Sequence, residues 1–208
     1  GNLDFPVKPC IASPHPLHYR NKIQLPHRNG KIGLFRKHSH DIVPLDKCYI
    51  QCALGEEIYG WLKTRLPPSI DYLLIRNGVF TDEALVIFIC KTNENLKPLA
   101  QEILKQFPQV KGVVLNINKG HSNRILGSSF KTLEGRDYIF EKIGGKTFKL
   151  SAPSFFQVNS WQASNLFQIA TEMIEPEDTV VDAFCGVGTL AIFATGRAKK
   201  VLGTEIVK

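Results

Sequence analysis

The sequence VVDAFCGVGT at residues 180–189, followed by VLGTE at residues 201–205, decides the fold of the last part of the chain. An apolar run that enters a glycine turn, a helical segment, and a second apolar run ending on a carboxylate are typical of the first βαβ unit of a nucleotide- or nucleoside-binding sheet. Gly186 and Gly188 can adopt backbone angles that other residues avoid, so the main chain can approach a ligand closely. Glu205 is placed to accept hydrogen bonds from both hydroxyls of a ribose. We therefore predict a site for an adenosine-bearing cofactor here.

Two other interpretations of the glycine turn stay open. Such a turn can join a strand to a helix without binding anything. A nicotinamide- or flavin-dependent oxidoreductase uses the same turn and ribose carboxylate, but it also binds a pyrophosphate at the start of the helix. Residues 179–208 alone supply too few strands to cover both faces of a doubly wound sheet. We therefore expect the chain to be a fragment of a longer protein, truncated at both ends.

Composition predicts a globular chain without a membrane-spanning segment. Of the 208 residues, 43% are apolar, and no continuous run approaches the ~18 apolar residues that a transmembrane helix needs. The chain begins at Gly1 without an initiator methionine or a signal-peptide pattern. Its five cysteines, an odd number without a secretory signal, are typical of free thiols in a reducing compartment. We therefore expect a cytoplasmic protein with no membrane partner.

Positive charge concentrates in the first quarter of the chain. The net charge is +7, and residues 1–50 hold eight Lys or Arg against three Asp or Glu, together with five of the six histidines. Cations beside aromatic residues suit an RNA backbone, whose phosphates supply the sequence-independent part of the affinity. A solvated basic face, or a non-catalytic RNA-binding module, would have the same charge pattern. The candidate RNA-binding cations are Arg20, Lys22, Arg36 and Lys37.

The first 150 residues predict a β-rich α+β domain. Asn-Gly at residues 29–30 and Gly-Gly at residues 144–145 are hairpin signals. Helix-period spacing of apolar residues alternates with short strand-like runs, and Cys90 closes one such run, so we expect it in the core. Strands are expected over 22–25, 31–35, 72–76, 84–90, 110–117, 138–143 and 147–150, and helices over 56–65 and 96–107.

A helix is expected over 161–174, with Asn159 or Ser160 as its N-cap. Its apolar residues Trp161, Leu166, Ile169, Ala170 and Met173 are predicted to pack against the sheet. The domain boundary is then near residue 151. We therefore expect a β-rich domain over 1–150 and the start of a Rossmann-like cofactor-binding domain over 151–208.

The run SAPSFFQVN at residues 151–159, together with the glycine turn, resembles the RNA uracil-5-methyltransferase family. The members of this family use S-adenosylmethionine to methylate C5 of uridine in ribosomal or transfer RNA. The pattern is most similar to bacterial members that modify 23S ribosomal RNA. The resemblance extends over nearly the whole chain, to YRNK at 19–22, SHDI at 39–42, DKC at 46–48 and LNIN at 115–118, with Asn123 and Gly127.

The resemblance implies roles for individual residues. Phe155 matches the aromatic residue that stacks on the flipped-out uracil, a contact worth about 1–3 kcal/mol, although core packing is the alternative for either Phe155 or Phe156. The cofactor carries a sulfonium cation and no phosphate, so an aromatic face such as Phe184 suits it. The residues implied to contact or approach the cofactor are Gln157, Phe184, Gly186, Gly188, Thr189 and Glu205.

No catalytic residue is assigned in these 208 residues. The resemblance implies a cysteine thiolate that adds to C6 of uracil and a base that removes the C5 proton. The cysteine of the family lies beyond Lys208, and the base is assigned to none of these residues. Cys185 is an unsuitable nucleophile because its position in the glycine turn requires a small side chain for close approach of the cofactor. We therefore expect the chain to be inactive by itself.

Cys48 matches a position that holds a [4Fe–4S] cluster in many bacterial relatives. Only Cys10 precedes it, and Cys52 follows at a spacing that makes no standard cluster motif. Either the other ligands lie before Gly1 or the protein lacks the cluster. A zinc site is disfavoured because no finger spacing occurs among Cys10, His15, His18 and Cys48.

Overall fold

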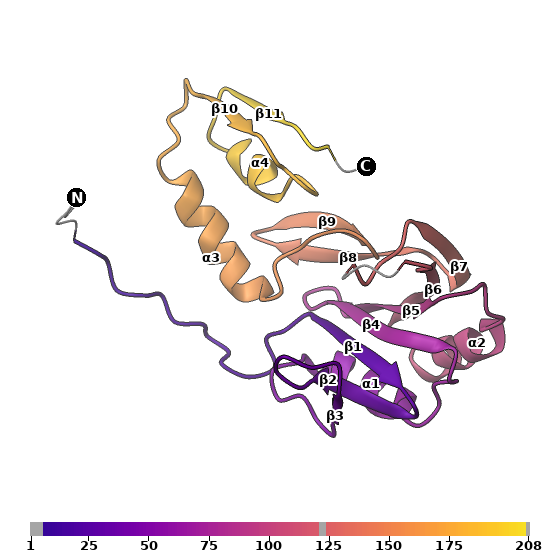
Figure 1. Cartoon of the computed structure of the whole chain (residues 1–208). Coiled ribbons are helices and arrows are strands. Elements are labelled where there is room, and N and C mark those ends of the chain that lie inside the picture. Colours follow the sequence, from indigo (N-terminus) through magenta and orange to yellow (C-terminus); the bar gives the residue numbers. More distant parts are fainter. Residues whose placement is uncertain (1–5, 121–123, 207–208) are drawn as a thin grey trace.

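A computed structural model of the chain describes residues 6–120 and 124–206 as a mixed α/β molecule (Figure 1). Its centre is a seven-stranded sheet with the order β3-β2-β1-β4-β5-β6-β7. β5 and β6 are parallel, and the other neighbours are antiparallel. The strands are β1 (Lys22–Arg28), β2 (Lys31–Phe35), β3 (Ile42–Pro44), β4 (Ile70–Gly78), β5 (Glu83–Cys90), β6 (Val110–Ile117) and β7 (Ser129–Gly135).

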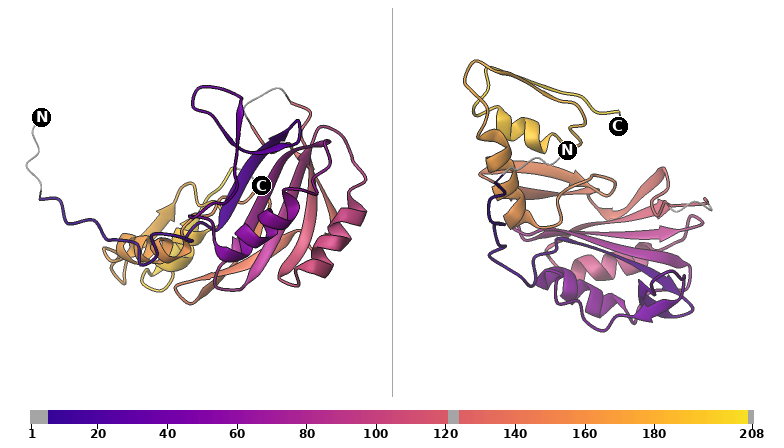
Figure 2. Two further views of the ribbon diagram at one scale, coloured as in Figure 1. Left: turned by 90° about the horizontal axis from the view of Figure 1, so that it is seen from below. Right: turned by 60° about the vertical axis from the view of Figure 1, so that its left-hand side comes forward.

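Two helices, α1 (Ala53–Leu62) and α2 (Lys97–Gln106), cover one face of this sheet (Figure 2). Alternate strand residues such as Leu73 and Phe88 pack against Tyr59 and Ile103 of the helices and form the first core. The intervening residues, for example Ile87, face the other side of the sheet and are equally buried. β5 is therefore covered on both faces, which explains its almost uninterrupted apolar sequence.

A hairpin of β8 (Tyr138–Ile143) and β9 (Lys146–Ser151) lies over the opposite face of the sheet. Gly144 and Gly145 form its turn with φ of +55° and +75°, a left-handed conformation that glycine adopts at no steric cost. Ile139, Phe148 and the buried Phe156 form the second core together with Ile87. The hairpin therefore carries the chain from the sheet to residues 152–159.

Helix α3 (Ser160–Thr171) leads to a small βαβ unit of β10 (Thr179–Asp182), α4 (Thr189–Ala194) and β11 (Lys200–Gly203). β10 and β11 are parallel. Phe193 of α4 is buried in the second core and lies 5.4 Å, between ring centroids, from Phe167 of α3. This contact attaches the βαβ unit to the remainder of the molecule, at the top of Figure 1.

Most predicted elements are confirmed, with small shifts of their ends. The hairpin signal at Asn29 and Gly30 is a two-residue turn with φ of +51° and +71°, so β1 extends three residues further than predicted. Helix α1 begins and ends three residues earlier than predicted. Strands β3 and β7 were not predicted, because β3 has three residues and β7 is largely exposed, without apolar alternation.

The predicted buried face of α3 is wrong. Leu166, Ile169 and Met173 are 52%, 45% and 84% exposed, whereas Ala163 and Thr171 are buried. The contact with the hairpin and α4 is made instead by Ala163 and by Phe167, whose ring packs against Phe193 of the second core. Asn159 is the N-cap, as predicted, and its Oδ1 accepts a hydrogen bond from the Gln162 N–H at 3.1 Å.

Within the described residues, no helix is long and apolar enough to cross a membrane.

Candidate functional site

Residues 19–22 and 151–159, far apart in the sequence, contact each other directly through Asn21. The Asn21 backbone N–H donates to the Val158 carbonyl at 2.8 Å. Its side-chain amide donates to the Gln157 carbonyl and to Ser160 Oγ, both at 2.9 Å. Asn21 is 4% exposed. One buried side chain therefore fixes the backbone of the segment that carries Phe155 and Gln157.

Glu141 of β8 extends this polar network beneath the same segment. Its carboxylate is fully buried and accepts hydrogen bonds from the N–H groups of Val79 and Phe80, at 2.9 and 3.0 Å, and from Ser160 Oγ at 2.7 Å. A buried charge needs several such partners. Glu141 thus joins the hairpin, the β4–β5 turn and the start of α3 at one point.

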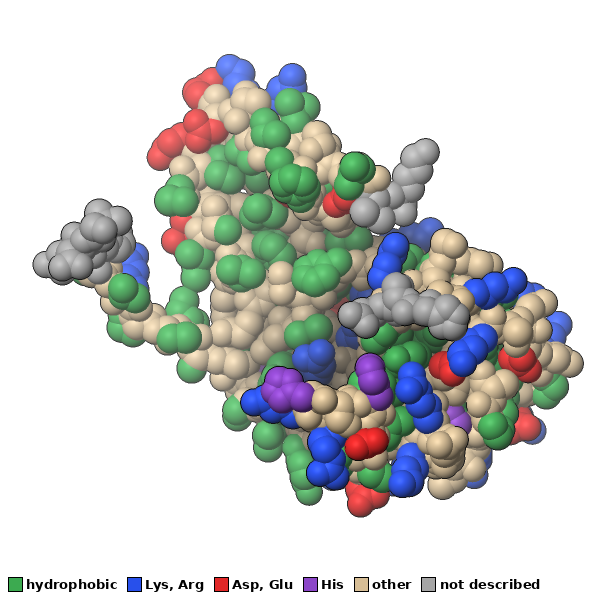
Figure 3. All heavy atoms as spheres, in the orientation of Figure 1, with side chains coloured by type: hydrophobic (Ala, Val, Ile, Leu, Met, Phe, Trp, Pro, Cys, Tyr) green, Lys and Arg blue, Asp and Glu red, His purple; other side chains and the backbone are tan. Residues whose placement is uncertain are grey.

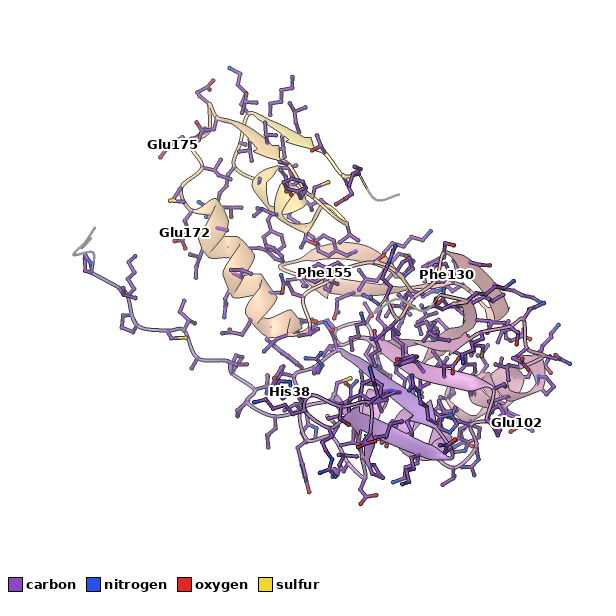
Figure 4. The ribbon with its side chains drawn as sticks, viewed as in Figure 1. His38, Glu102, Phe130, Phe155, Glu172 and Glu175 are labelled. Carbon is purple, nitrogen blue, oxygen red and sulfur yellow. The ribbon has the colours of Figure 1, made fainter. Side chains whose placement is uncertain are left out.

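A cleft of about 400 Å³ opens between β1 and the 155–158 segment; we call it the β1 cleft. Phe155 is 74% exposed and lies at its rim, whereas Phe156 is 5% exposed and packs in the second core. Figure 4 shows Phe155 at the centre of the molecule, between the sheet and the βαβ unit. The cleft is lined by Arg20, Lys22, Leu25, Cys48, Phe155 and Val158, among others.

The β1 cleft is cationic. Lys22 and Arg76 are paired across β1 and β4. Burial, with smaller contributions from the Arg76 and Arg20 charges, lowers the pKa of Lys22 from 10.5 to about 8, and burial lowers the pKa of Arg76 to about 10. The Arg76 guanidinium donates to the carbonyls of Ala152 and Ser154. Among the described residues, no carboxylate forms an ion pair with Lys22, Arg20 or Arg76 within 4.0 Å.

This arrangement favours an anion. Two cations held side by side, with one guanidinium nitrogen, Nε of Arg76, buried without a hydrogen-bond partner, repel each other unless negative charge approaches. A phosphate or an enolate-like oxygen would relieve this repulsion. An aromatic face at the rim of the same cleft offers a surface on which a base can stack. The β1 cleft therefore has the chemistry of a nucleotide site.

The glycine turn between β10 and α4 forms a second candidate site. Gly186 and Gly188 have φ of +55° and +77°, and no atom lies within 4 Å of a Cβ built on Gly186. Glu205 Oε2 accepts a hydrogen bond from the Gly186 N–H at 2.9 Å, so the carboxylate lies across the turn. Phe184 is 85% exposed, and Thr189 begins α4 with 8% exposure.

The remaining predicted residues lie elsewhere. Gln157 is half-buried and lines a separate cavity of about 400 Å³ between α3 and the extended segment that contains Ile11. Arg36 and Lys37 are exposed in the turn between β2 and β3 and do not line the β1 cleft. The structure therefore brings Arg20, Lys22 and Phe155 together and separates Arg36 and Lys37 from them.

The cysteines do not form a cluster. Cys48 is half-buried, with its N–H donating to Glu56 Oε2 at 3.1 Å, and Cys10 is exposed. The described residues contain no group of three or more potential metal ligands. The described cysteines therefore do not fit the four thiolate ligands of a [4Fe–4S] centre. Cys90 is buried in the first core, as predicted.

Some residues that carry the family resemblance have structural contacts. The Asn116 side chain is buried and bonds to Gly127 through both its amide nitrogen and its oxygen, at 3.0 and 2.8 Å. Asn118 donates to the carbonyls of Arg124 and Ile125. These contacts hold residues 124–127 against the end of β6; Asn123 lies outside the described residues.

Three residues of the site were missed from the sequence. For Arg76 the sequence did offer a signal, because an arginine at the end of the apolar run YLLIR of β4 is expected to be buried with its neighbours. Asn21 belongs to the YRNK run that resembles the family, but nothing in the sequence indicates its buried contacts. For Glu141 no sequence pattern indicates burial. Buried polar residues of this kind are recognised only when their partners, more than sixty residues away, are known.

The chain is similar over its whole length to RNA methyltransferases. It is 35% identical over 230 residues to an uncharacterized RNA methyltransferase of Oceanobacillus iheyensis, and 35% identical over 228 residues to one of Bacillus cereus. Each alignment covers 100% of this chain and 50% of the relative. The chain thus spans about half the length of the relatives it matches. No protein-family model matches it.

Among solved structures, the tRNA (uracil-54, C5)-methyltransferase of Pyrococcus abyssi, in complex with S-adenosyl-L-homocysteine, matches with a TM-score of 0.73 and 25% identity. The match covers 93% of this chain and 50% of that protein. The chain is therefore homologous to RNA methyltransferases and shares the fold of half of a methyltransferase chain.

Proposed function

We propose that this chain belongs to an S-adenosylmethionine-dependent enzyme that methylates C5 of a uridine in RNA. The observation that carries the proposal is the match over 93% of the chain to a structure of a C5-uracil tRNA methyltransferase, with a TM-score of 0.73. In this proposal residues 151–208 are the start of the cofactor-binding domain, and residues 1–150 contribute the RNA-facing surface.

The glycine turn fits the proposed cofactor. Gly186 leaves open space above the main chain among the described residues, and the exposed ring of Phe184 offers a face for a sulfonium cation. Glu205 lies at the carboxyl end of β11, where a carboxylate accepts hydrogen bonds from a ribose. Thr189 and Gln157 complete the proposed contacts. When bound, S-adenosylmethionine supplies an electrophilic methyl group.

The β1 cleft fits the proposed target nucleotide. Phe155 presents its ring to solvent, where an extruded uracil can stack. Arg20, Lys22 and Arg76 supply positive charge beside it, which suits a phosphate or the polarised O4 of the base. The cysteine nucleophile of the family is assigned to none of the five cysteines of this chain.

Methylation by the natural protein that carries these 208 residues tests the proposal. The protein is incubated with radiolabelled S-adenosylmethionine and with transcripts of 23S ribosomal RNA or transfer RNA, and the digested nucleosides are analysed by mass spectrometry. We expect 5-methyluridine and no other methylated nucleoside. A methyl group on another atom, or no transfer to either RNA, would contradict the proposed reaction.

Two different observations bear on the RNA substrate. The family resemblance favours 23S ribosomal RNA, and the match to the archaeal enzyme favours transfer RNA. We propose ribosomal RNA, and the two transcripts in the same assay decide between them. Calorimetry with S-adenosylhomocysteine and with NADH separates this proposal from an oxidoreductase, which would bind NADH in preference.

A further inference from the structure

A second cleft, of about 550 Å³, lies at the opposite end of β1 from Lys22; we call it the aromatic cleft. It lies between the ends of β1, β2 and β5, the start of β4 and the loop after β6. No predicted site residue lines it. The residues on which the inference rests are Arg28, Phe35, His40, Asp71, Tyr72 and Lys91.

The aromatic cleft lies on the sheet face opposite α1 and α2, beyond the edge of the β8–β9 hairpin. Tyr72 alternates with Leu74, which is fully buried in the second core, and is itself only partly buried. Lys22 pairs with Arg76 and Pro26 with Tyr72 along the two strands. Arg28 lies six residues after Lys22 along β1, a span of roughly 20 Å. One short single strand could therefore follow β1 from one cleft to the other.

Aromatic rings meet in this cleft without stacking on one another. The Phe35 ring lies edge to face with His40, at 5.6 Å between centroids and 86° between planes, and with Tyr72, at 6.5 Å and 81°. Edge-to-face contacts leave flat ring surface for a further planar group. Arg28 Cζ lies 5.8 Å from the Phe35 centroid, so a cation also borders this surface.

Two of the cations that line the cleft, Arg28 and Lys91, are not paired with its carboxylate. Arg28 and Lys91 are exposed and, within the described parts of the chain, form no ion pair within 4.0 Å. Among the described lining residues, Asp71 is the only acidic one. Asp71 lies where the pairing of β4 with β5 is irregular, between Ile70 and Tyr72. A carboxylate there would repel a phosphate but accept a hydrogen bond from a base amino group.

We propose that the aromatic cleft binds an unpaired RNA base that carries an exocyclic amino group and lies a few nucleotides from the target uridine in the same strand. The base stacks on the Phe35 ring with the Tyr72 ring at its edge, its amino group donates to Asp71, and Arg28 and Lys91 contact the flanking phosphates. The inference rests on the proposed function only in that the substrate is RNA. It adds a second recognition site, which determines the sequence beside the target.

Fluorescence titration of the 208-residue chain tests this site. The probe is a short single-stranded oligoadenylate that contains one 2-aminopurine between two abasic positions, so that neighbouring bases do not quench it and its emission falls when it stacks on an aromatic ring. The variant Arg28→Gln/Phe35→Leu removes a cation and an aromatic ring from the cleft. We expect the variant to bind the probe about tenfold more weakly, or more weakly still, and we expect the quenching to be lost. Oligoadenylate contains no uridine, so this readout is independent of methylation.

The matched control is Trp61→Leu/Arg65→Gln. Arg65 Cζ lies 4.4 Å from the Trp61 ring on α1, which covers the other face of the sheet, so this pair is chemically similar but remote from the cleft. We expect unchanged binding. If Phe35→Leu impairs folding, as judged by circular dichroism, Arg28→Gln/Lys91→Gln replaces only exposed side chains and should still weaken binding several-fold.

Asp71→Asn tests the preference for an amino group. The natural chain should bind oligoadenylate or oligocytidylate more tightly than oligouridylate, and Asp71→Asn should reduce this difference. Equal loss of affinity in the cleft and control variants would overturn the assignment, as would affinity for an acidic peptide but not for RNA. If the cleft variants lose RNA binding and the natural protein makes no 5-methyluridine, the proposed reaction fails and the aromatic cleft stands.

Discussion

Lys22 illustrates how one residue links folding to binding. Its pKa of about 8 in the folded chain is below its ordinary value of 10.5, mainly because it is buried and secondarily because Arg76 and Arg20 lie near it. Below pH 8 the lysine is charged in the folded and the unfolded chain. Between pH 8 and 10.5 the folded chain has released this proton and the unfolded chain has not, so the free energy of unfolding rises with pH.

We therefore predict a pH-dependent difference between the natural chain and Lys22→Met. Urea denaturation at about pH 7 and about pH 10 gives the free energy of unfolding of each. The natural chain should gain stability relative to Lys22→Met at the higher pH. Its folded form carries a buried Lys22 cation beside Arg76 at pH 7 and has lost that charge at pH 10, whereas Lys22→Met has no cation there at either pH. Other titrating groups are common to both proteins and cancel in the comparison. A constant difference would contradict the burial of this cation.

Replacing Glu141 should lower the stability of the chain, because its carboxylate joins three elements. Glu141→Gln puts an amide NH₂ where one carboxylate oxygen accepted hydrogen bonds, so at least one buried donor among Val79, Phe80 and Ser160 loses its partner. We predict a loss of roughly 1–3 kcal/mol in the free energy of unfolding. Glu102→Gln, an exposed change on α2 that is labelled in Figure 4, is the control and should be nearly neutral. Equal effects would show that the network contributes little.

Phe155 and Phe156 mark the limit of prediction at the residue scale. Two adjacent aromatic residues give no local signal about which of them faces solvent. The answer depends on Asn21, which fixes the following backbone from more than a hundred residues away. The exposure of Phe155 is compatible with the role that the family resemblance implies, and that role stays a proposal.

At the scale of elements, local chemistry predicted turns and caps well and packing faces poorly. Asn29, Gly30, Gly144 and Gly145 adopt left-handed angles in two-residue turns, which sequence alone predicts because few residues tolerate that conformation. The buried face of α3 was mispredicted because hydrophobicity was taken as a guide to contact. Its contact face holds Ala163 and Phe167, and Leu166, Ile169 and Met173 lie outside it.

Strands β3 and β7 show why edge strands escape a sequence pattern. Both lie at the ends of the seven-stranded sheet, where only one neighbour is present. β7 has one buried residue, Leu133, and the register with β6 is set by backbone hydrogen bonds rather than by apolar alternation. Backbone pairing with a partner that lies elsewhere in the chain is invisible to periodicity.

On the scale of the whole molecule, basic side chains predominate over the sheet. Figure 3 shows most Lys, Arg and His side chains there, with some acidic ones among them, whereas acidic side chains and a few basic ones share the region near the end of α3. Glu172 and Glu175, labelled in Figure 4, belong to this region. A polyanion is therefore drawn toward the sheet face that holds both clefts and away from the end of α3. This charge distribution is compatible with the RNA partner proposed above.

The seven-stranded sheet is buried more completely than the βαβ unit. β5 is buried along nearly its whole length, whereas Val181 of β10 and Leu202 of β11 are 60% and 44% exposed. The βαβ unit depends on Phe193, which packs between Phe167 and the backbone of Gly144. Amide hydrogen exchange should therefore be faster in residues 179–203 than in β5, because the unit can open without unfolding the sheet.

Phe193→Ala should increase this difference. The substitution removes a buried aromatic side chain, a change that costs about 3–5 kcal/mol in a closely packed site. Because that cost falls on the junction between α4 and the hairpin, we expect exchange to accelerate throughout residues 179–203 and to stay unchanged in β4, β5 and β6. Phe130→Ala, at a partly exposed site on β7, should change neither region by more than a small factor. Uniform acceleration in the Phe193→Ala chain would mean that the βαβ unit and the sheet unfold as one cooperative body, and the glycine turn would then be as rigid as the β1 cleft.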